Sequence, residues 1–214
     1  MKIFFDFDDV LFNSKQFKED YFSIFKKRGV SRKIFEACYY DPLDERNIKL
    51  YDPMGHIKRV CSEIGIDVTT LEAEISAFVA DTSDYVFADV VGALARFQRK
   101  QLCIVSFSTT NFQKAKIANS GIAHFFGKIS IVDSLKGEVI AEIIKKEKLA
   151  GQEGLYFIDD RTEQLESVKM RSASVQTVLC VRTEGRYHDR KNKYCDYKIS
   201  QLKGLEKIIK IHGK

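Results

Sequence analysis

The sequence predicts an α/β fold in which helices cover both faces of a parallel β-sheet. Three observations lead to this prediction. A short apolar run, residues 3–5, opens the chain and ends in acidic residues, as a buried strand that leads into a loop does. After Asp89, apolar runs alternate with segments of helical periodicity, a pattern typical of parallel sheets. Between these regions the patterns are helical throughout, so we expect a helical cap inserted after the first strand.

The boundaries of the elements follow from apolar periodicity and from stop signals such as Gly29. We assign residues 1–14 and 87–214 to the core and residues 15–86 to the cap. Cap helices are expected at residues 16–27, 31–38, 53–64 and 70–79. Further strands are expected at residues 102–105, 129–132, 155–158 and 175–181. Core helices are expected at residues 90–99, 112–119 (with Thr109, Thr110 or Asn111 as its cap), 139–149, 163–170 and 201–211.

The composition is that of a globular chain. Of the 214 residues, 44% are hydrophobic, which is enough for a core. The net charge is +5, but basic and acidic residues are interspersed, which argues against a nucleic-acid partner. No apolar run approaches the roughly 18 residues that span a bilayer, so we expect no membrane partner. The five cysteines are scattered and odd in number, which favours reduced thiols and a cytoplasmic location.

Polar residues stand where three of the predicted strands end: Asp6, Asp8, Ser106, Asp159 and Asp160. Ligands of parallel sheets bind beyond the carboxyl ends of the strands, so these side chains should surround one crevice. Carboxylates held close together repel one another, and a hard divalent cation relieves the repulsion. Mg²⁺ typically binds one or two carboxylates together with a substrate phosphate, so the pattern favours metal-dependent chemistry on a phosphate group.

The same residue types can transfer a phosphoryl group. A carboxylate can attack phosphorus and form an aspartyl-phosphate, while a neighbouring carboxyl group moves the proton. Ser106 and the backbone N–H groups that lead into the next helix would bind phosphate oxygens. Ser108 is the alternative to Ser106, which we prefer because it directly follows the last apolar residue of its strand. Lys136, just before a helix, would balance the charge of the nucleophile and the phosphate.

Four motifs in this order resemble those of the haloacid dehalogenase-like (HAD) hydrolase superfamily. Residues 6–14, Asp-Phe-Asp-Asp-Val-Leu-Phe-Asn-Ser, are similar to its first motif, D-x-D-x-T/V-L/I. Residues 104–106 resemble the second motif, residues 135–138 the lysine motif and residues 157–160 the acidic fourth motif. The tail at residues 196–202 is also similar. The resemblance implies a HAD-like Rossmannoid core and a cap of the C1 type, a lid over small substrates.

The resemblance also implies a role for each acidic residue. Asp6 would be the nucleophile and a metal ligand. Asp8 would be the general acid and base, and its backbone carbonyl would contact the metal. Asp160 would complete the metal shell, with Asp159 behind it. The implied cofactor is therefore Mg²⁺.

For substrate binding, the resemblance implies Ser106, Lys136 and the position of Phe107. Two residues depart from the family pattern. Phe107 stands where Asn is frequent, which removes a polar contact near the phosphate. Asp9 stands where Gly is frequent, which adds a charge to the turn that leads to the cap. We interpret Asp9 itself as a turn residue.

Side chains outside the motifs are expected to be mainly structural. The aromatic residues of the first cap helix should form the core of the cap: Phe17, Tyr21, Phe22 and Phe25. Four polar residues near turns of the cap are candidates for contact with the leaving group: Asp41, Arg46, His56 and Arg59. Basic residues near the C-terminus are expected in a solvated loop: Arg186, Arg190, Lys191 and Lys193.

We therefore predict a Mg²⁺-dependent phosphatase that acts on a small phosphorylated metabolite. A phosphomutase of the same superfamily is the first alternative, because it would form the same aspartyl-phosphate. A dehalogenase would not need the proton-transfer group that Asp8 supplies. A non-catalytic binding or regulatory protein is a further alternative, which Asp9 and Phe107 keep open. The sequence does not define the substrate or the oligomeric state.

Overall fold

A six-stranded parallel sheet lies at the centre of a computed structural model that describes residues 1–46, 49–108 and 111–212. The strands lie in the order β3-β2-β1-β4-β5-β6, and each neighbouring pair is parallel. Their bounds are β1 (Lys2–Phe5), β2 (Leu102–Phe107), β3 (Lys128–Val132), β4 (Leu155–Asp159), β5 (Gln176–Cys180) and β6 (Tyr197–Ile199). The predicted α/β class is confirmed.

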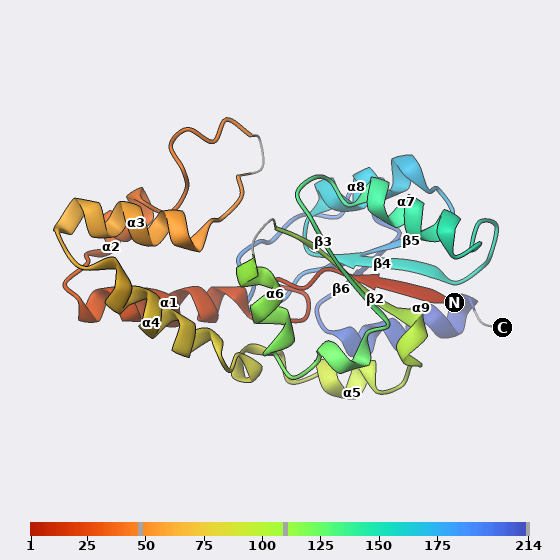
Figure 1. Cartoon of the computed structure of the whole chain (residues 1–214). Helices are drawn as coiled ribbons and strands as arrows, with labels where there is room; N and C mark the ends of the chain where they lie inside the picture. Colours follow the sequence, from red (N-terminus) through yellow and green to blue (C-terminus); the bar gives the residue numbers. More distant parts are fainter. Residues whose placement is uncertain (47–48, 109–110, 213–214) are drawn as a thin grey trace.

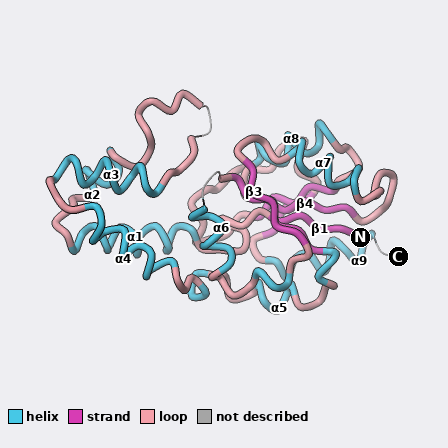
Figure 2. Tube along the Cα trace, in the orientation of Figure 1, coloured by secondary structure: helices cyan, strands magenta, loops and turns pink. Residues whose placement is uncertain are grey.

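Helices cover both faces of this sheet (Figures 1 and 2). One face carries α5 (Val90–Leu94), α6 (Asn111–Ala118) and α9 (Leu205–His212), and the other carries α7 (Gly137–Lys146) and α8 (Thr162–Arg171). Successive side chains of a strand point to opposite faces, so Ile3 and Phe5 pack with the first group of helices and Phe4 with the second. Because both faces are buried, β1 is apolar without interruption from Ile3 to Phe5.

The cap contains helices and no strand in its described residues (Figure 2). Its helices are α1 (Ser14–Lys27), α2 (Arg32–Ala37), α3 (Pro53–Ile64) and α4 (Val68–Val79). The aromatic residues of α1 are buried, which confirms that they form the core of the cap: Phe17, Tyr21, Phe22 and Phe25. The side chain of Ser31 accepts a hydrogen bond from the N–H of Ile34 and caps α2, because the first turn of a helix has unpaired N–H groups.

The two chain segments that join the core to the cap run side by side. The N–H of Asn13 donates to the carbonyl of Tyr85 over 2.7 Å, and the N–H of Phe87 donates to the carbonyl of Leu11 over 3.1 Å. The side chain of Asn13 also accepts from the N–H of Gln16 and caps α1. The cap is therefore attached close to the end of β1, where the first acidic motif lies.

One predicted helix differs from the structure, and one strand of the structure was not predicted. The helix expected at residues 90–99 ends at Leu94. A 3₁₀ turn over Arg99–Gln101, in which the Gln101 side chain accepts a hydrogen bond from the N–H of Gln98, then leads directly into β2. The short strand β6 was not predicted, since three residues show no clear apolar pattern. The proposed caps Thr109 and Thr110 lie outside the described residues. Other 3₁₀ turns are Ser83–Tyr85, Ala123–Phe125 and Leu202–Gly204.

All five cysteines are free thiols. Within the described ranges, every helix is too short or too polar to cross a bilayer.

Candidate active site

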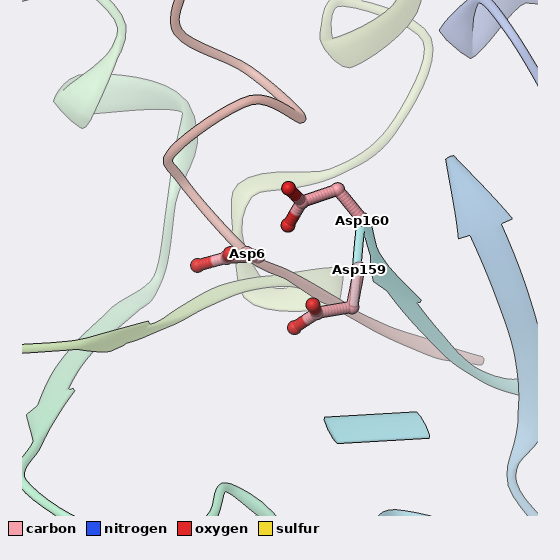
Figure 3. Close-up of side chains that lie close together, drawn as sticks. All are labelled: Asp6, Asp159 and Asp160. Atoms are coloured by element: carbon pink, nitrogen blue, oxygen red, sulfur yellow. The ribbon is translucent and has the colours of Figure 1, made fainter. Parts of the chain in front are cut away.

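The ends of β1 and β4 bring three aspartates together (Figure 3). Asp6 directly follows β1, Asp159 is the last residue of β4, and Asp160 follows it. The N–H of Asp6 donates to the carbonyl of Ile158 over 2.8 Å, which places Asp6 beside Asp159. One carboxylate oxygen of each aspartate lies within 4.8 Å of the other two, and all three side chains are buried. This acidic cluster lies at the carboxyl edge of the sheet.

Lys136 supplies positive charge to the acidic cluster. Its Nζ lies 2.8 Å from Asp6 Oδ1 and 2.7 Å from Asp159 Oδ2, and its side chain is 1% exposed. The side-chain carbonyl of Gln164 accepts a hydrogen bond from the backbone N–H of Lys136 and fixes the turn before α7. Burial alone would lower the pKa of Lys136, but the two aspartates outweigh this effect and raise the pKa above its usual value. Lys136 therefore remains charged at neutral pH.

The acidic cluster holds more carboxylate charge than one lysine neutralises. Burial raises the pKa of Asp6 to about 7, against the lowering effect of Lys136, and Asp159 adds to the rise. Burial and the charge of Asp159 also raise the pKa of Asp160 well above its usual value. A further cation in this position would therefore stabilise the ionised forms.

The hydrogen bonds show which oxygens could hold that cation. Asp159 has both oxygens engaged, by Lys136 and by the N–H of Arg161. Asp160 Oδ2 is buried and has no hydrogen-bond partner in the described part of the chain. Such a buried acceptor is costly unless something binds it. The donor set therefore fits Mg²⁺, with Asp6 and Asp160 as ligands and Asp159 behind them.

Asp8 accepts hydrogen bonds from three side chains. Lys116 Nζ lies 2.6 Å from its Oδ1, Gln113 Nε2 lies 2.7 Å from its Oδ2, and the Ser14 hydroxyl donates to Oδ1. Burial alone would raise the pKa of Asp8. The charges of Lys116 and Arg186, with the hydrogen bonds from Lys116 and Ser14, outweigh burial and hold the pKa well below its usual value. Asp8 is therefore a fixed carboxylate at neutral pH.

The two serines of the second motif lie at different depths. Ser106 lies inside β2, because the strand continues to Phe107, and it is buried. Its hydroxyl lies 2.8 Å from Gln113 Nε2, so that Gln113 bridges Ser106 and Asp8. Phe107 and Ser108 line the cavity above the acidic cluster. Ser108 is therefore nearer than Ser106 to the space that a substrate would enter.

Asp9 adds a buried charge to the turn after β1, and Arg186 neutralises it. Asp9 has a φ of 55°, in the left-handed region, which explains why Gly is favoured at such a position. Arg186 Nε lies 2.5 Å from Asp9 Oδ2. Arg186 lies in an exposed loop, as predicted, but its guanidinium group is paired with a buried carboxylate, which was not predicted. A buried carboxylate needs a counter-charge, and the loop after β5 folds back to supply one.

The four polar cap residues predicted to lie near the leaving group do not line the cavity. Asp41 and Arg46 form hydrogen bonds within their own loop. Arg59 donates to the carbonyl of Cys38, and His56 is fully buried. This prediction was wrong because polarity near a turn is equally typical of side chains that satisfy the backbone of a loop.

A cavity of about 180 Å³ lies over the acidic cluster. Its floor includes Asp6, Asp8, Lys136 and Asp160. The side chains that the cap contributes are mainly aromatic and basic: Phe17, Lys18, Tyr21, Tyr39, Tyr40 and Tyr51. A cavity of this size suits a small ligand rather than a polymer.

Several residues of the site were missed in the sequence. Gln113 and Lys116 are three residues apart and therefore lie on one face of α6, directed at Asp8. Their spacing shows that they share one face of the helix, but no local pattern shows that this face meets Asp8. Tyr187 and Arg161 also line the cavity, but no local pattern marks them.

The parallel sheet, with its acidic cluster and buried lysine at the carboxyl edge, defines a hydrolase of the HAD type. The model of the haloacid dehalogenase-like hydrolase family matches residues 3–166, which include all four motifs. The chain belongs to this family, and the resemblance seen in its motifs is confirmed.

Solved structures with this fold cover nearly the whole chain. A provisionally named haloacid dehalogenase-like hydrolase from Burkholderia xenovorans LB400 is 19% identical, with a TM-score of 0.69, and the match covers 99% of this chain and 97% of that one. The provisionally named HAD-hydrolase YfnB from Bacillus subtilis, bound to magnesium, is 14% identical, with a TM-score of 0.67 and 97% of each chain covered. L-2-haloacid dehalogenase from Xanthobacter autotrophicus is 13% identical, with a TM-score of 0.61 and 98% of each chain covered.

At these identities the likeness shows the fold alone. A search of curated protein sequences found no significant match.

Proposed function

We propose that the chain is a Mg²⁺-dependent phosphatase that hydrolyses small phosphomonoesters through an aspartyl-phosphate. The observation that carries this proposal is the buried acidic cluster, in which Asp160 Oδ2 has no partner in the described residues. Displacement of a halide needs a nucleophilic carboxylate but no cation. A phosphate group brings further negative charge to the acidic cluster, and Mg²⁺, when bound, would supply the positive charge that holds both together.

Asp6 is the nucleophile in this proposal. Lys136 and the N–H of Phe7 hold its Oδ1, and Oδ2 attacks phosphorus in line with the leaving oxygen. As the bond from Asp6 to phosphorus forms, the bond from phosphorus to the leaving oxygen breaks, and Asp8 gives that oxygen a proton. Water then attacks phosphorus, Asp8 takes its proton, and Asp6 is released with inorganic phosphate.

The surroundings of Asp8 support its role in both steps. The lowered pKa keeps Asp8 ionised and therefore free to accept a proton in the second step, although it also makes the carboxylate a weaker base. For the first step Asp8 must bind a proton, and the negative charge of an arriving phosphate favours this by raising the pKa of Asp8. Lys136 and Ser108, which both line the cavity, would bind the phosphate oxygens. The small cavity favours a small phosphorylated metabolite over a nucleic acid or a membrane surface as the partner.

Release of inorganic phosphate tests this proposal. A panel of small phosphomonoesters is incubated with Mg²⁺ or with EDTA, using the parent chain, Asp6→Asn and Asp8→Asn. Asp133→Asn is the matched control, because Asp133 is exposed and follows β3, an outer strand that does not carry the acidic cluster. We expect turnover that needs Mg²⁺, is lost in the first two variants and persists in the control.

Other outcomes would contradict the proposal. Turnover that survives Asp6→Asn would show that Asp6 is not the nucleophile. Chloride release from 2-haloacids without phosphate release would identify a dehalogenase. Transfer of phosphate between two positions of a sugar, without net release, would identify a phosphomutase.

A further inference from the structure

Two exposed tyrosine rings on the cavity wall have no part in the proposed chemistry. Tyr40 comes from the loop after α2, and Tyr187 comes from the loop after β5. They are 39% and 37% exposed, whereas every other aromatic side chain of the cap is buried or half-buried. Covering an aromatic ring with another apolar surface is favourable, because it removes apolar area from water. These two rings therefore have surface available for a ligand.

The inner tyrosines of the cavity already have structural partners. The Tyr51 hydroxyl lies 2.9 Å from the Tyr21 hydroxyl and 2.9 Å from His56 Nδ1. The rings of Tyr39 and Tyr51 stack, with centroids 4.3 Å apart. These contacts explain the inner tyrosines as parts of the cap core. The positions of Tyr40 and Tyr187 on the cavity wall have no such structural explanation.

Both exposed rings are held in place by neighbours. The guanidinium group of Arg161 lies 4.2 Å from the centroid of the Tyr187 ring, and that of Arg186 lies 5.3 Å from it. The Tyr40 ring packs edge-on against Tyr39, with centroids 4.9 Å apart. Rings held in this way lose little conformational entropy when a ligand binds.

Tyr40 and Tyr187 reach one cavity from two parts of the molecule, Tyr40 from the cap and Tyr187 from the core. Both residues line the same cavity as Asp6 and Lys136. A molecule that carries its phosphate to Asp6 would therefore extend its other end along these rings.

We infer that Tyr40 and Tyr187 bind a planar ring in the leaving group, so that the preferred substrates are phosphomonoesters of aromatic or heteroaromatic molecules. This inference rests on the proposed phosphatase function. Stacking on aromatic side chains is strong and tolerates different rings, because every such ring presents a π-face. The surface therefore selects a class of leaving group rather than one compound.

Pairs of phosphate esters with and without an aromatic ring test this inference. Adenosine 5′-monophosphate and ribose 5-phosphate share the same phosphate ester at C5′, and 2-phenylethyl phosphate and butyl phosphate form a simpler pair. We expect kcat/KM to be at least tenfold higher for the member with the ring. Tyr40→Leu and Tyr187→Leu should each reduce this ratio at least threefold, with little change for ribose 5-phosphate.

Two controls separate stacking from other roles. Tyr40→Phe and Tyr187→Phe keep the rings and should keep the ratio. Tyr194→Leu removes a tyrosine that does not line the cavity and should leave both rates unchanged. If the Leu variants lose activity equally on both members of a pair, the tyrosines serve cap closure, and the inference is wrong.

The remaining outcomes distinguish this inference from the proposed function. Equal rates for the parent chain on both members of each pair would overturn the inference and leave the phosphatase intact. No hydrolysis of any ester would overturn the phosphatase. In that case, calorimetric titration of the folded Asp6→Asn chain measures whether Tyr40 and Tyr187 bind a planar ring. Tighter binding of adenosine 5′-monophosphate than of ribose 5-phosphate, lost in Tyr40→Leu, would support the ring site, and equal binding would overturn it.

Discussion

Two buried lysines determine how the carboxylates of the site are held. Lys136 forms salt bridges with Asp6 and Asp159, and Lys116 forms one with Asp8. Lys136 could be predicted from the sequence, because it stands just before a helix and the four motifs follow one another in the order typical of the family. Lys116 was not predicted, because a lysine in the middle of a helix is most often solvated. Its importance follows from a contact that only the folded chain makes.

We expect Lys116→Met to reduce kcat for phosphate release at least tenfold, with a smaller effect on KM. The variant keeps most of the side-chain volume but removes the charge that fixes Asp8, the group that moves protons in both steps. Lys114→Met is the matched control, because Lys114 is exposed on the same helix. Initial rates over a range of substrate concentrations separate kcat from KM. Equal losses in the two variants would refute a specific role for Lys116.

At the scale of single elements, close packing of α7 against α8 positions the site. Gly137 begins α7 directly after Lys136. A Cβ at Gly137 would lie 2.3 Å from the backbone oxygen of Ser167 in α8, so that only Gly allows this approach. The end of β4 and the start of α7 thus meet closely enough for Lys136 to reach Asp159. The predicted helix and strand were correct here, but the sequence pattern did not reveal their contact.

Gly137→Ala and Gly92→Ala should therefore change stability in opposite directions. The first substitution forces α7 away from α8 and should lower the free energy of unfolding by about 3 kcal/mol. Gly92 lies in α5, where an added Cβ would have no atom within 4 Å, so its substitution should raise the free energy of unfolding by about 0.5–1 kcal/mol. Urea unfolding of both variants checks this. A stable Gly137→Ala variant would show that α7 and α8 tolerate a wider separation.

The cap should lose stability as the pH falls from about 6.5 to about 4. His56 in α3 is buried, its Nε2–H donates to the Phe35 carbonyl, and its Nδ1 accepts from the Tyr51 hydroxyl. Burial lowers the pKa of His56 from 6.5 to about 4. In this window the unfolded chain binds a proton that the folded chain excludes, so the free energy of unfolding decreases with falling pH, by about 2–3 kcal/mol at pH 4.5.

Urea unfolding at pH 7 and pH 4.5 checks the role of His56. His56→Gln should lose less stability between these pH values than the parent chain does. His124→Gln is the control, because His124 is exposed, and it should behave as the parent does. If the His56 variant retains the full pH dependence, the loss arises from carboxyl groups instead.

At the scale of the whole molecule, the site lies where the cap meets the carboxyl edge of the sheet. The core contributes the acidic cluster and Lys136, and the cap contributes the aromatic wall of the cavity. The two segments that connect them are tied together beside β1. Movement of the cap about these segments would open the cavity without disturbing the carboxylates, which belong to the core.

Binding of Mg²⁺ should stabilise the whole chain. At a concentration about 100-fold above its dissociation constant, the ion adds about 2.7 kcal/mol to the free energy of unfolding, which raises the midpoint of thermal unfolding by roughly 5–10 °C in a chain of this size. EDTA should reverse the rise. Asp160→Asn should abolish it, because it removes the carboxylate whose oxygen lacks a partner among the described residues. Asp133→Asn should retain it, and a rise that persists in Asp160→Asn would place the ion elsewhere.

The α/β class and the positions of Asp6, Asp8, Asp159 and Asp160 at strand ends could be predicted from the sequence alone. Both follow from local patterns, because the period of apolar residues identifies strands and helices, and strand ends in a parallel sheet meet at one edge. Only the tertiary structure revealed the partners. Lys116 and Asp8 are 108 residues apart, and Arg186 and Asp9 are 177 residues apart. Their pairing depends on how the whole chain folds back to neutralise buried charge, which no local pattern encodes.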